Sequence, residues 1–534
     1  MTQVAGLAGN RGRNLLHLDS QNPGGAEIAV IVTNREDAPI VKSAAARGIP
    51  TEVVPQQSMS RADHEQAIID VLESYEFELI CLDGYMRVLT ATFLEATPPI
   101  LNVHPSLLPA FPGLNSHQQA LDAGVRLSGC TVHVVTEAVD GGPIITQESV
   151  PVYSDDTTDS LKNRVLTEAE YVAYPRAVRW VATGACTIGP DTSDPQVTID
   201  TDAEEQFPTR RIRTEDRTDT LRYGENPHQE AAAYVDLATD TPSIISAKQL
   251  NPNAKELSYN NYNDADGALE LITEFDRPAA AVIKHTNPAG CATASSLSDA
   301  YADALSTDAM SAFGGIVALN RRCDAATAEQ IIESFKEVVI APRYSDQAID
   351  ILTQKENLRI LAIGPLDQLH TSSSSATTVH EKHLRGGRLV QQRDDWVPSI
   401  SDLDIVTDTS PTESQLETMC FAWRVLKHVK SNGIVLATDT QTVGIGMGQV
   451  SRVDAVRLAT MKADEHAEEK GPVGSVMASD AFFPFPDGVE TALDAGVAAV
   501  VQPGGSVNDD DVISACDAQD VPMAFTGHRC FRHD

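Results

Sequence analysis

Two polar side chains close one of the apolar segments of this chain in a pattern that could support chemistry. Asn102 and His104 flank Val103 at the end of an apolar run, and side chains two apart in a strand lie on one face. An amide can donate to the oxyanion that develops on a carbonyl, and an imidazole can move the proton of an attacking amine. The pair suits transfer from an amide-like carbonyl, although a satisfied strand-end asparagine beside a core histidine has the same spacing.

A second pair follows another apolar run. Lys284 and His285 come directly after Ala279–Ile283, so both lie at the end of an expected strand. A cation beside an imidazole can depress one pKa and supply a general acid next to a general base. Two neighbouring basic residues on the surface are the commoner alternative.

The segments that position the first pair alternate between short apolar runs and amphipathic stretches. This rhythm predicts βαβ units with a parallel sheet. The expected strands are Val4–Ala8, Ile28–Thr33, Glu52–Val54, Leu79–Leu82 and Ile100–Val103, and the expected helices are Pro39–Arg47 and Arg61–Tyr75. Because such sheets place ligands at the carboxyl ends of their strands, the loops Gly9–Asn14, Gly84–Leu89 and His104–Gly113 are the candidate binding segments.

A change of composition divides the chain. Apolar periodicity stops between Gly184 and Thr218, where a Pro/Thr/Asp-rich stretch is typical of an exposed connection. The second segment again has α/β texture, with a helix expected from Ser296 or Ser298 through Leu305. We interpret the Ser/Thr tract Thr371–Thr378 as a solvated loop.

The overall composition excludes several classes of protein. A net charge of −36 over 534 residues argues against binding to nucleic-acid phosphates, and its spread along the chain suggests a halophilic source. The eight scattered cysteines include no CxxC pair, and no apolar run reaches the length of a membrane span. We therefore expect a soluble cytoplasmic protein with free thiols.

The first segment resembles the folate-dependent glycinamide ribonucleotide (GAR) formyltransferases over about residues 1–183. The resemblance rests on GYMRVL at Gly84–Leu89, LNVHPSLLPAFPG at Leu101–Gly113 and TVHVVTEAVDGGPIITQ at Thr131–Gln147. It implies a Rossmann-like domain over residues 1–185, with Asn102, His104 and Asp140 as the catalytic set and His133 as structural support.

The same resemblance implies the binding residues of this domain. The family's phosphate loop corresponds to Gly9–Asn14, where Arg11 is inserted and Arg13 replaces a common serine. The implied phosphate ligands are Gly12, Arg13 and Asn14, and the implied folate contacts are Arg61, Met86, Arg87, Val88 and Leu89.

The second segment resembles the aminoimidazole carboxamide ribonucleotide (AICAR) formyltransferase part of the bifunctional purine enzyme, over residues 215–534. The motifs are RYGENPHQ at 222–229, ELSYNNYNDAD at 256–266, KHTNPAG at 284–290, SAFGGIVA at 311–318, LRGG at 384–387, KHVKSNGIV at 427–435, SDAFFPFPDGVE at 479–490, VQPGGS at 501–506 and the terminal HRCFRH. The resemblance implies an α/β region of two cytidine-deaminase-like subdomains after a linker at 186–214. The cyclohydrolase domain that precedes this region in the family is expected to be absent.

Roles in the second region also follow from the resemblance. Lys284, His285 and Asn432 become the catalytic residues, as proton donor, base and ligand of the formyl oxygen respectively. The implied nucleotide contacts are Arg222, Tyr223, Asn261, Phe313, Gly314, Glu337, Arg529 and His533, with Phe482 on the folate side. Seen alone, the last residues would be interpreted as a frayed basic tail.

Together the two resemblances imply a double formyltransferase of purine synthesis that uses 10-formyltetrahydrofolate without a metal. The HxE and PCxxC signature of zinc deaminases is absent from the sequence. A homodimer through the second region is expected, with GAR and AICAR as substrates and with neither nucleic acid nor membrane as partner. The alternatives are a first domain of other specificity, such as methionyl-tRNA or a sugar, or a domain that only binds folate or nucleotide.

Overall fold

The computed structural model describes residues 2–56, 59–200, 207, 211, 213, 215–237, 242–366, 379–467 and 470–533. The chain divides into two compact units, Met1–Arg211 and Ile212–Asp534. The expected loop at Thr371–Thr378 lies outside the described residues. Among the helices that are described, none is long and apolar enough to cross a membrane.

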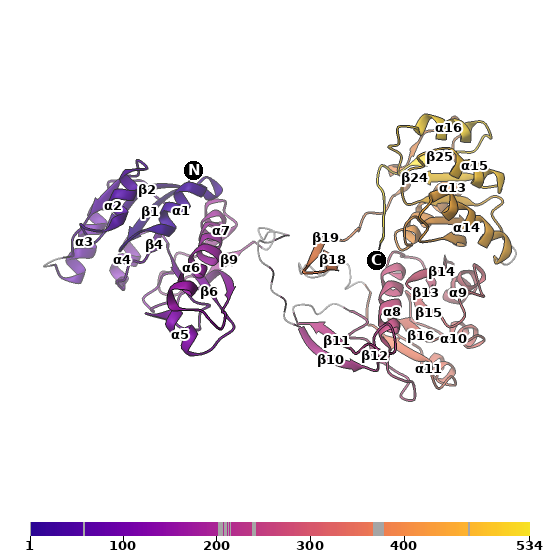
Figure 1. The fold of residues 1–534 in the computed structure, drawn as a ribbon, viewed down its shortest axis with the longest axis horizontal. Coiled ribbons are helices and arrows are strands. Elements are labelled where there is room, and N and C mark those ends of the chain that lie inside the picture. The colour runs from indigo at the N-terminus through magenta and orange to yellow at the C-terminus, as the bar shows by residue number, and fades with distance from the viewer. Residues whose placement is uncertain are drawn as a thin grey trace. The chain divides into compact units, whose positions relative to one another are not determined.

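A seven-stranded sheet forms the centre of the first unit, in the order β3-β2-β1-β4-β5-β6-β7 (Figure 1). Strands β1 to β5 run parallel, whereas β6 and β7 are antiparallel additions at one edge. The strands are β1 Gln3–Ala8, β2 Glu27–Thr33, β3 Thr51–Val53, β4 Leu79–Asp83, β5 Ile100–His104, β6 Leu127–Val134 and β7 Ile144–Pro151. The parallel-rich α/β architecture predicted from the sequence is confirmed.

Helices cover both faces of this sheet and enclose two apolar cores. One core contains side chains of α1 Arg13–Gln21, α2 Pro39–Ala45, α5 Ser116–Asp122, α6 Thr158–Val165 and α7 Tyr171–Ala182. The other contains side chains of α3 Arg61–Leu72 and α4 Ala91–Ala96. Because the strands are buried on both faces, loops at their ends are the places where polar side chains can gather.

The start of the expected linker is folded. Strands β8 Cys186–Ile188 and β9 Val197–Ile199 form an antiparallel hairpin. Cys186 is buried in the core of the first unit, and Ile188, Val197 and Ile199 pack against it. The prediction of an exposed connection from residue 186 is therefore wrong for residues 186–199. The many Pro and Asp residues of this stretch are typical of a loop, and they obscured the short alternation of apolar and polar residues at Val197–Ile199.

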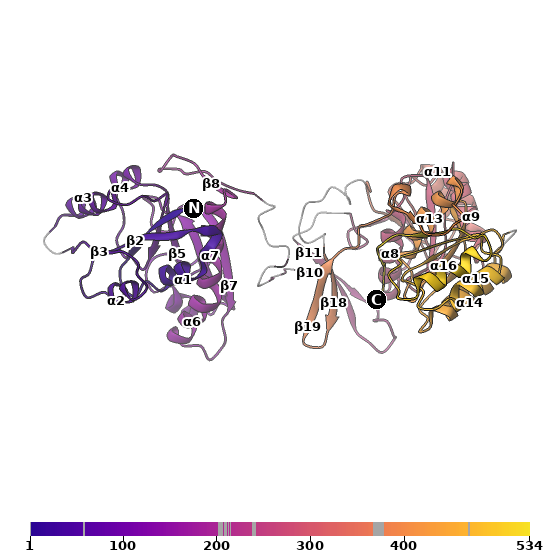
Figure 2. The ribbon, with the colours of Figure 1, turned by 90° about the horizontal axis from the view of Figure 1, so that it is seen from above.

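The second unit is built on a twelve-stranded sheet, in the order β12-β17-β16-β15-β13-β14-β22-β21-β23-β24-β25-β20 (Figures 1 and 2). The first six strands in sequence are β12 Lys248–Gln249, β13 Ala279–Lys284, β14 Asn287–Thr293, β15 Ile316–Leu319, β16 Val338–Ala341 and β17 Arg359–Ala362. The last six are β20 Asp404–Ile405, β21 Ile434–Thr438, β22 Gln441–Gly446, β23 Val476–Ser479, β24 Ala499–Gln502 and β25 Met523–Phe525. Two separate hairpins complete the strands, β10 Glu215–Leu221 with β11 Ala231–Asp236 and β18 Val379–Leu384 with β19 Gly387–Gln392.

The twelve strands form two halves with the same topology. In each half an antiparallel hairpin, β13–β14 or β21–β22, leads to three parallel strands and ends at an antiparallel edge strand. The halves meet where β14 pairs with β22. The helices of the first half are α8 Tyr259–Ile272, α9 Leu297–Ser306, α10 Ala325–Ile332 and α11 Asp346–Leu352, and those of the second are α13 Glu413–Leu426, α14 Arg452–Glu465, α15 Asp487–Asp494 and α16 Asp509–Asp517.

The packing of the β8–β9 hairpin leads to a test on fragments. A fragment of residues 1–200 is expected to unfold at higher urea concentration than a fragment of residues 1–185. The hairpin side chains bury apolar surface, and partial burial of two or three such side chains contributes about 1–3 kcal/mol. Tryptophan fluorescence from Trp180, which lies in the same core, reports the transition. Equal midpoints for the two fragments would mean that the hairpin is only an extension of the linker.

Candidate active sites

The candidate catalytic residues of the first unit are in contact. His104, the last residue of β5, places Nδ1 3.2 Å from Oδ2 of Asp140, and its Nε2 lies 3.0 Å from the carbonyl oxygen of Phe111. The Asp140 carboxylate also accepts the backbone N–H of Gly113 at 2.8 Å. His104 is buried, so its imidazole is held between a carboxylate and a carbonyl away from bulk water. This geometry suits a residue that holds and passes on a proton.

His133 orients the amide of Asn102 from the neighbouring strand. The two residues are directly paired between β5 and β6, and Asn102 Nδ2 lies 3.2 Å from His133 Nε2. Burial lowers the pKa of His133, so its ring is neutral, with Nδ1 donating to the carbonyl of Val134 at 3.0 Å. Nε2 then accepts one amide hydrogen of Asn102, and the other hydrogen can bind an oxyanion.

The predicted folate residues lie around the N-terminus of α3. Glu65 accepts hydrogen bonds from Arg61 Nε at 3.3 Å and from the hydroxyl of Thr90. Arg87 lies 3.1 Å from His64, so one contact joins the Gly84–Leu89 loop to α3, and Thr90, which directly follows the loop, adds a second. In the same loop Met86 and Val88 are exposed, whereas Leu89 is buried. The sequence analysis missed His64 and Glu65, whose burial on a helix next to a loop has no local signal.

The phosphate loop differs from what the sequence predicted. The backbone N–H groups of Asn14 and Leu15 donate to Asp83 Oδ2, at 2.7 and 3.4 Å, and the Asn14 amide donates to Glu170 at 2.6 Å. An anion at the start of α1 would therefore have to bind Gly12 and Arg13 rather than Asn14. Burial raises the pKa of Asp83 and raises that of Glu170 to about 7.

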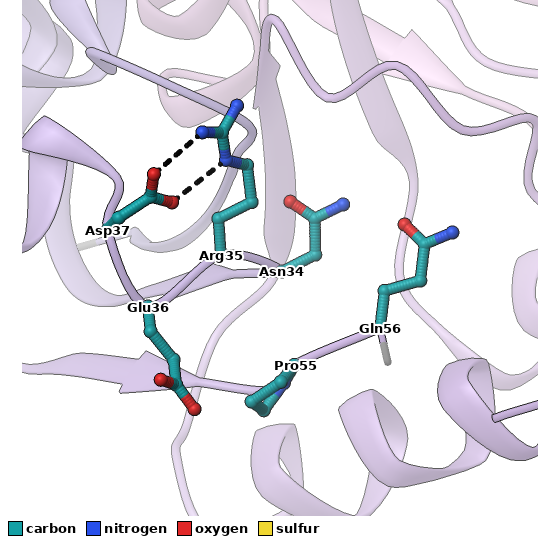
Figure 3. A pocket seen from close by; sticks show the side chains of 6 residues that line it. All are labelled: Asn34, Arg35, Glu36, Asp37, Pro55 and Gln56. Carbon is teal, nitrogen blue, oxygen red and sulfur yellow. Dashed lines mark hydrogen bonds and ion pairs between the residues drawn. The ribbon is translucent and has the colours of Figure 1, made fainter. Parts of the chain in front are cut away.

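A cavity of about 610 Å³ opens beside these loops, at the carboxyl ends of β2 and β3 (Figure 3). It is lined by Asn34, Arg35, Glu36, Asp37, Pro55 and Gln56. Arg35, the one cation among the described lining residues, is bound by Asp37 through two hydrogen bonds of 3.1 and 2.9 Å. These described lining residues include none of those predicted from the sequence.

In the second unit the candidate catalytic pair lies at a strained turn. His285 and Thr286 connect β13 to β14, with φ angles of 51° and 62°. Left-handed backbone is unfavourable for a β-branched residue such as Thr286. The turn is held by the N–H of Thr286, which donates to Asp264 at 2.8 Å, and by the Asn287 amide, which donates to the His285 carbonyl at 3.1 Å. The turn therefore fixes His285 at the end of the hairpin.

Lys284 points toward the SAFGG loop. Its Nζ donates to the carbonyl oxygens of Phe313 and Gly314, both at 3.3 Å. Gly314 has a φ of 68°, and a Cβ at this position would lie 3.2 Å from Lys284 Nζ. The backbone conformation therefore favours glycine here, and a side chain at this position would also crowd the lysine ammonium.

Several predicted nucleotide residues gather beside this lysine. The Asn261 amide, at the N-terminus of α8, donates to Glu337 at 2.8 Å, and the N–H of Glu337 donates to the carbonyl of Gly315 at 3.1 Å. Burial lowers the pKa of Arg359, against the opposing effects of Glu337 and Tyr223 close by. Arg222 lies over the Tyr223 ring at 5.1 Å. The sequence analysis missed Arg359, which begins β17 outside any motif.

Asn432 lies in a second group of residues, apart from Lys284 and His285. Its side-chain amide is not free to bind a ligand, as the sequence analysis implied it would be. Both hydrogens of its amide are donated to backbone carbonyls, of Gln449 at 2.9 Å and Val450 at 3.0 Å. Its oxygen accepts from Arg452 at 2.8 Å, and Arg452 pairs with the fully buried Asp480 at 2.5 Å. As described, the Asn432 amide has no hydrogen left for a formyl oxygen, so the role as donor requires a rearrangement.

The C-terminal residues are anchored to this second group. Ser431 donates its N–H to the Arg532 carbonyl at 2.8 Å, and Arg532 donates its N–H back to the Ser431 hydroxyl at 3.0 Å. Arg529 lies over the ring of Phe531, which also contacts His533. The interpretation as a frayed tail is therefore wrong up to residue 533, because Ser431 supplies backbone partners. Phe482 is 41% exposed and follows Asp480 closely in the chain.

A hydrogen bond joins the loops of the two groups in the second unit. The N–H of Lys430 donates to the Asn287 side-chain oxygen at 3.1 Å, which joins the His285 turn to the loop that carries Asn432. Arg452 and Asp480 were missed by the sequence analysis, although Asp480 stands within a quoted motif. Among the residues that the structure describes, no group of three or more His, Cys, Asp or Glu could hold a metal ion.

Comparison with known proteins matches both units. Residues 4–178 match the "Formyl transferase" family model, and residues 193–462 match the "AICARFT/IMPCHase bienzyme" family model. The "Bifunctional purine biosynthesis protein PurH" of Roseobacter denitrificans is 43% identical over 410 residues, which are 75% of this chain and 73% of that protein. The protein of that name from Sinorhizobium medicae is 51% identical over 321 residues, which are 59% and 58% of the two chains.

Solved structures are also similar to the first unit. Glycinamide ribonucleotide transformylase 1 from Symbiobacterium toebii is 40% identical with a TM-score of 0.35, and covers 37% of this chain and 94% of its own. Phosphoribosylglycinamide formyltransferase from Brucella melitensis is 44% identical with a TM-score of 0.32, and covers 34% of this chain and 96% of its own.

The two matched regions and the His104 and Lys284 groups define the chain as a formyltransferase with two transfer units. It belongs to the AICARFT/IMPCHase bienzyme family, whose model covers residues 193–462 and whose relatives align over most of the chain.

The buried Glu170 leads to a prediction about pH. Its pKa is about 7 in the folded protein and about 4.3 in an unfolded chain, so the folded state favours the protonated acid. The resulting stability is present below pH 4 and is lost as the pH rises through 7. Glu170→Gln should therefore stabilise residues 1–200 at pH 8 by about 2–3 kcal/mol in urea denaturation, but leave pH 4 nearly unchanged.

Asp83 adds its own pH dependence in both proteins, because burial raises its pKa as well. An unchanged pH dependence in Glu170→Gln would contradict this assignment.

Proposed function

We propose that the first unit formylates GAR and the second formylates AICAR, both with 10-formyltetrahydrofolate, in the synthesis of inosine monophosphate. The observation that supports this most directly is the contact of His104 with Asp140, next to Asn102, in the unit that matches formyl transferases. In each reaction the bond from the formyl carbon to folate N10 breaks, and a bond to the substrate amine forms. The amine loses one proton, and N10 gains one.

In the first unit the proton is managed by His104. Asp140 fixes its Nδ1, so the nitrogen that exchanges a proton with the substrates is Nε2, which faces the Phe111 carbonyl. Asn102, held by His133, donates its second amide hydrogen to the oxyanion on the formyl carbon. Gly12 and Arg13 bind the GAR phosphate, and the folate lies along Met86–Leu89 near Arg61 and Arg87.

In the second unit Lys284 and His285 divide the proton transfer. Two hydrogens of the Lys284 ammonium are directed to the Phe313 and Gly314 carbonyls, which leaves the third for folate N10. His285, fixed on the turn, accepts the proton of the AICAR amine. Tyr223, Asn261, Gly314 and Glu337 surround the nucleotide, and Arg222 supplies a cation for its phosphate.

Further parts of the proposal concern the setting of the enzyme. The second region mediates a homodimer, and the protein acts in the cytoplasm. The charge of −36 favours a medium of high salt, where dense surface carboxylates stay hydrated. Arg529, His533 and Phe482, anchored with the Asn432 loop, complete the AICAR site on the nucleotide and folate sides.

His104→Ala tests the first site. GAR formylation should fall by at least about 100-fold, because general acid–base groups contribute about 10²–10⁴-fold to rate. AICAR formylation by the same sample should stay within about twofold, and serves as the control for protein concentration and for the second unit. Steady-state assays with each ribonucleotide and 10-formyltetrahydrofolate measure both rates. Parallel loss of the two activities would contradict the model of two separate sites.

Lys284→Met tests the second site. We expect the turnover with AICAR to fall by about 10²–10⁴-fold while the affinity for the nucleotide changes little, since other cations such as Arg222 bind the phosphate. Lys248→Met, on an exposed edge strand, is the control and should change turnover less than threefold. Weakened affinity with unchanged turnover would remove Lys284 from catalysis.

Inosine monophosphate released from formylated AICAR in this assay would contradict the expected absence of cyclohydrolase.

A further inference from the structure

A buried ion pair lies behind the loop that holds Lys284. Asp308, which is 2% exposed, accepts a hydrogen bond from Lys462 Nζ at 2.8 Å. It also accepts the N–H of Ser311 at 2.9 Å and the Ser311 hydroxyl at 2.6 Å. Burial would raise the pKa of Asp308, but the bonds from Lys462 and Ser311 outweigh it and leave the pKa lowered. The Asp308 carboxylate is therefore ionised, and it accepts hydrogen bonds both from Lys462 and from its own turn.

The turn that Asp308 organises carries the acceptors of the Lys284 ammonium. Ala312 donates its N–H to the Asp308 carbonyl at 3.0 Å, and Gly315 donates to the Ala312 carbonyl at 3.1 Å. Between these residues stand Phe313 and Gly314, whose carbonyls face Lys284 Nζ. Three short links therefore connect Lys462 with Lys284: the ion pair, the turn and the carbonyls.

Lys462 comes from the other half of the twelve-stranded sheet, on helix α14. This helix lies directly against β22. A Cβ on Gly446 would come within 1.9 Å of the Ala455 carbonyl, and one on Gly444 within 2.3 Å of the Ala459 carbonyl. Such contact leaves the helix little room to shift. Its first residue, Arg452, in turn holds the Asn432 side chain.

We propose that Lys462 and Asp308 are positioning residues for formyl transfer in the second unit, which hold the Phe313–Gly314 carbonyls so that Lys284 keeps its orientation. The inference rests on the proposed AICAR activity. Neither residue contacts Lys284 directly. Removing Lys462 would leave a buried carboxylate without its cation, and the cost of that state would be relieved by movement of the turn.

The kinetic test uses the full chain. Lys462→Met should lower kcat for AICAR at least about 10-fold, since small misplacement of reacting groups costs up to about 100-fold in rate, while KM rises less than about threefold. Lys462→Arg should recover most of the rate. Ser311→Ala, which removes one bond from the turn at small risk to folding, should lower kcat about threefold. Arg457→Met, in an exposed pair on the same helix, is the matched control and should keep its rate.

Two further measurements separate positioning from a general loss of structure. The pH profile of kcat should move in Lys462→Met but not in Arg457→Met, because the environment of the Lys284 ammonium changes. GAR formylation in the first unit should be unaffected in all variants. The inference is overturned if Lys462→Met keeps kcat within twofold, or if it loses rate with an unchanged pH profile.

Labelling of Lys284 distinguishes failure of this inference from failure of the proposed function. Trinitrobenzenesulfonate, followed by peptide mass spectrometry, should modify Lys284 at least about threefold faster in Lys462→Met than in Arg457→Met, because released carbonyls no longer hold the ammonium. This readout needs no activity. An inactive wild-type chain would refute AICAR formylation, whereas equal labelling of the two variants would refute the positioning role.

Discussion

Each candidate site depends on a buried strand that ends at a candidate catalytic residue. This constraint determines how the rest of the site is arranged. β5 ends at His104 and β13 ends at Lys284, and the apolar part of each strand is buried by sheet neighbours. A strand fixed by pairing on both sides cannot rotate, so the polar residue at its end has a defined direction before any ligand arrives. Loops then need only to supply acceptors, such as Asp140 or the Phe313 carbonyl.

Patterns local to the sequence predicted this framework well. The strands that end at Ala8, Thr33 and His104 follow directly from apolar runs, and Ser296 caps α9 as the capping chemistry predicts. The pairing of Asn102 and His104 on one face could also be predicted, because it depends only on the period of a strand. The resemblance to the GAR formyltransferases then directed attention to Asp140, which is distant in the sequence.

Contacts between distant segments could not be predicted in this way. Asp83 accepts hydrogen bonds from the N–H groups at the start of α1. The Asn432 side chain accepts a hydrogen bond from Arg452 and donates to two backbone carbonyls. In both cases a residue with a plausible ligand role is already satisfied by a partner far along the chain. Glu170 shows the same limit, since its raised pKa arises from burial that no local pattern signals. Sequence motifs indicate which residues approach a site, but not which of their atoms are free.

The two halves of the second unit share a topology but place different groups at matching positions. Gln415, at the start of α13, donates to the backbone carbonyl of Ala498 at 3.0 Å, where its counterpart Asn261 donates to the side chain of Glu337. The strand β21 ends at Thr438, where β13 ends at Lys284. At the matching hairpin the first half therefore carries an ammonium and an imidazole, whereas the second carries a hydroxyl and, at Asp439, a carboxylate. The second half also acts on the first through one helix, because α14 binds both the Asn432 side chain and the Asp308 turn.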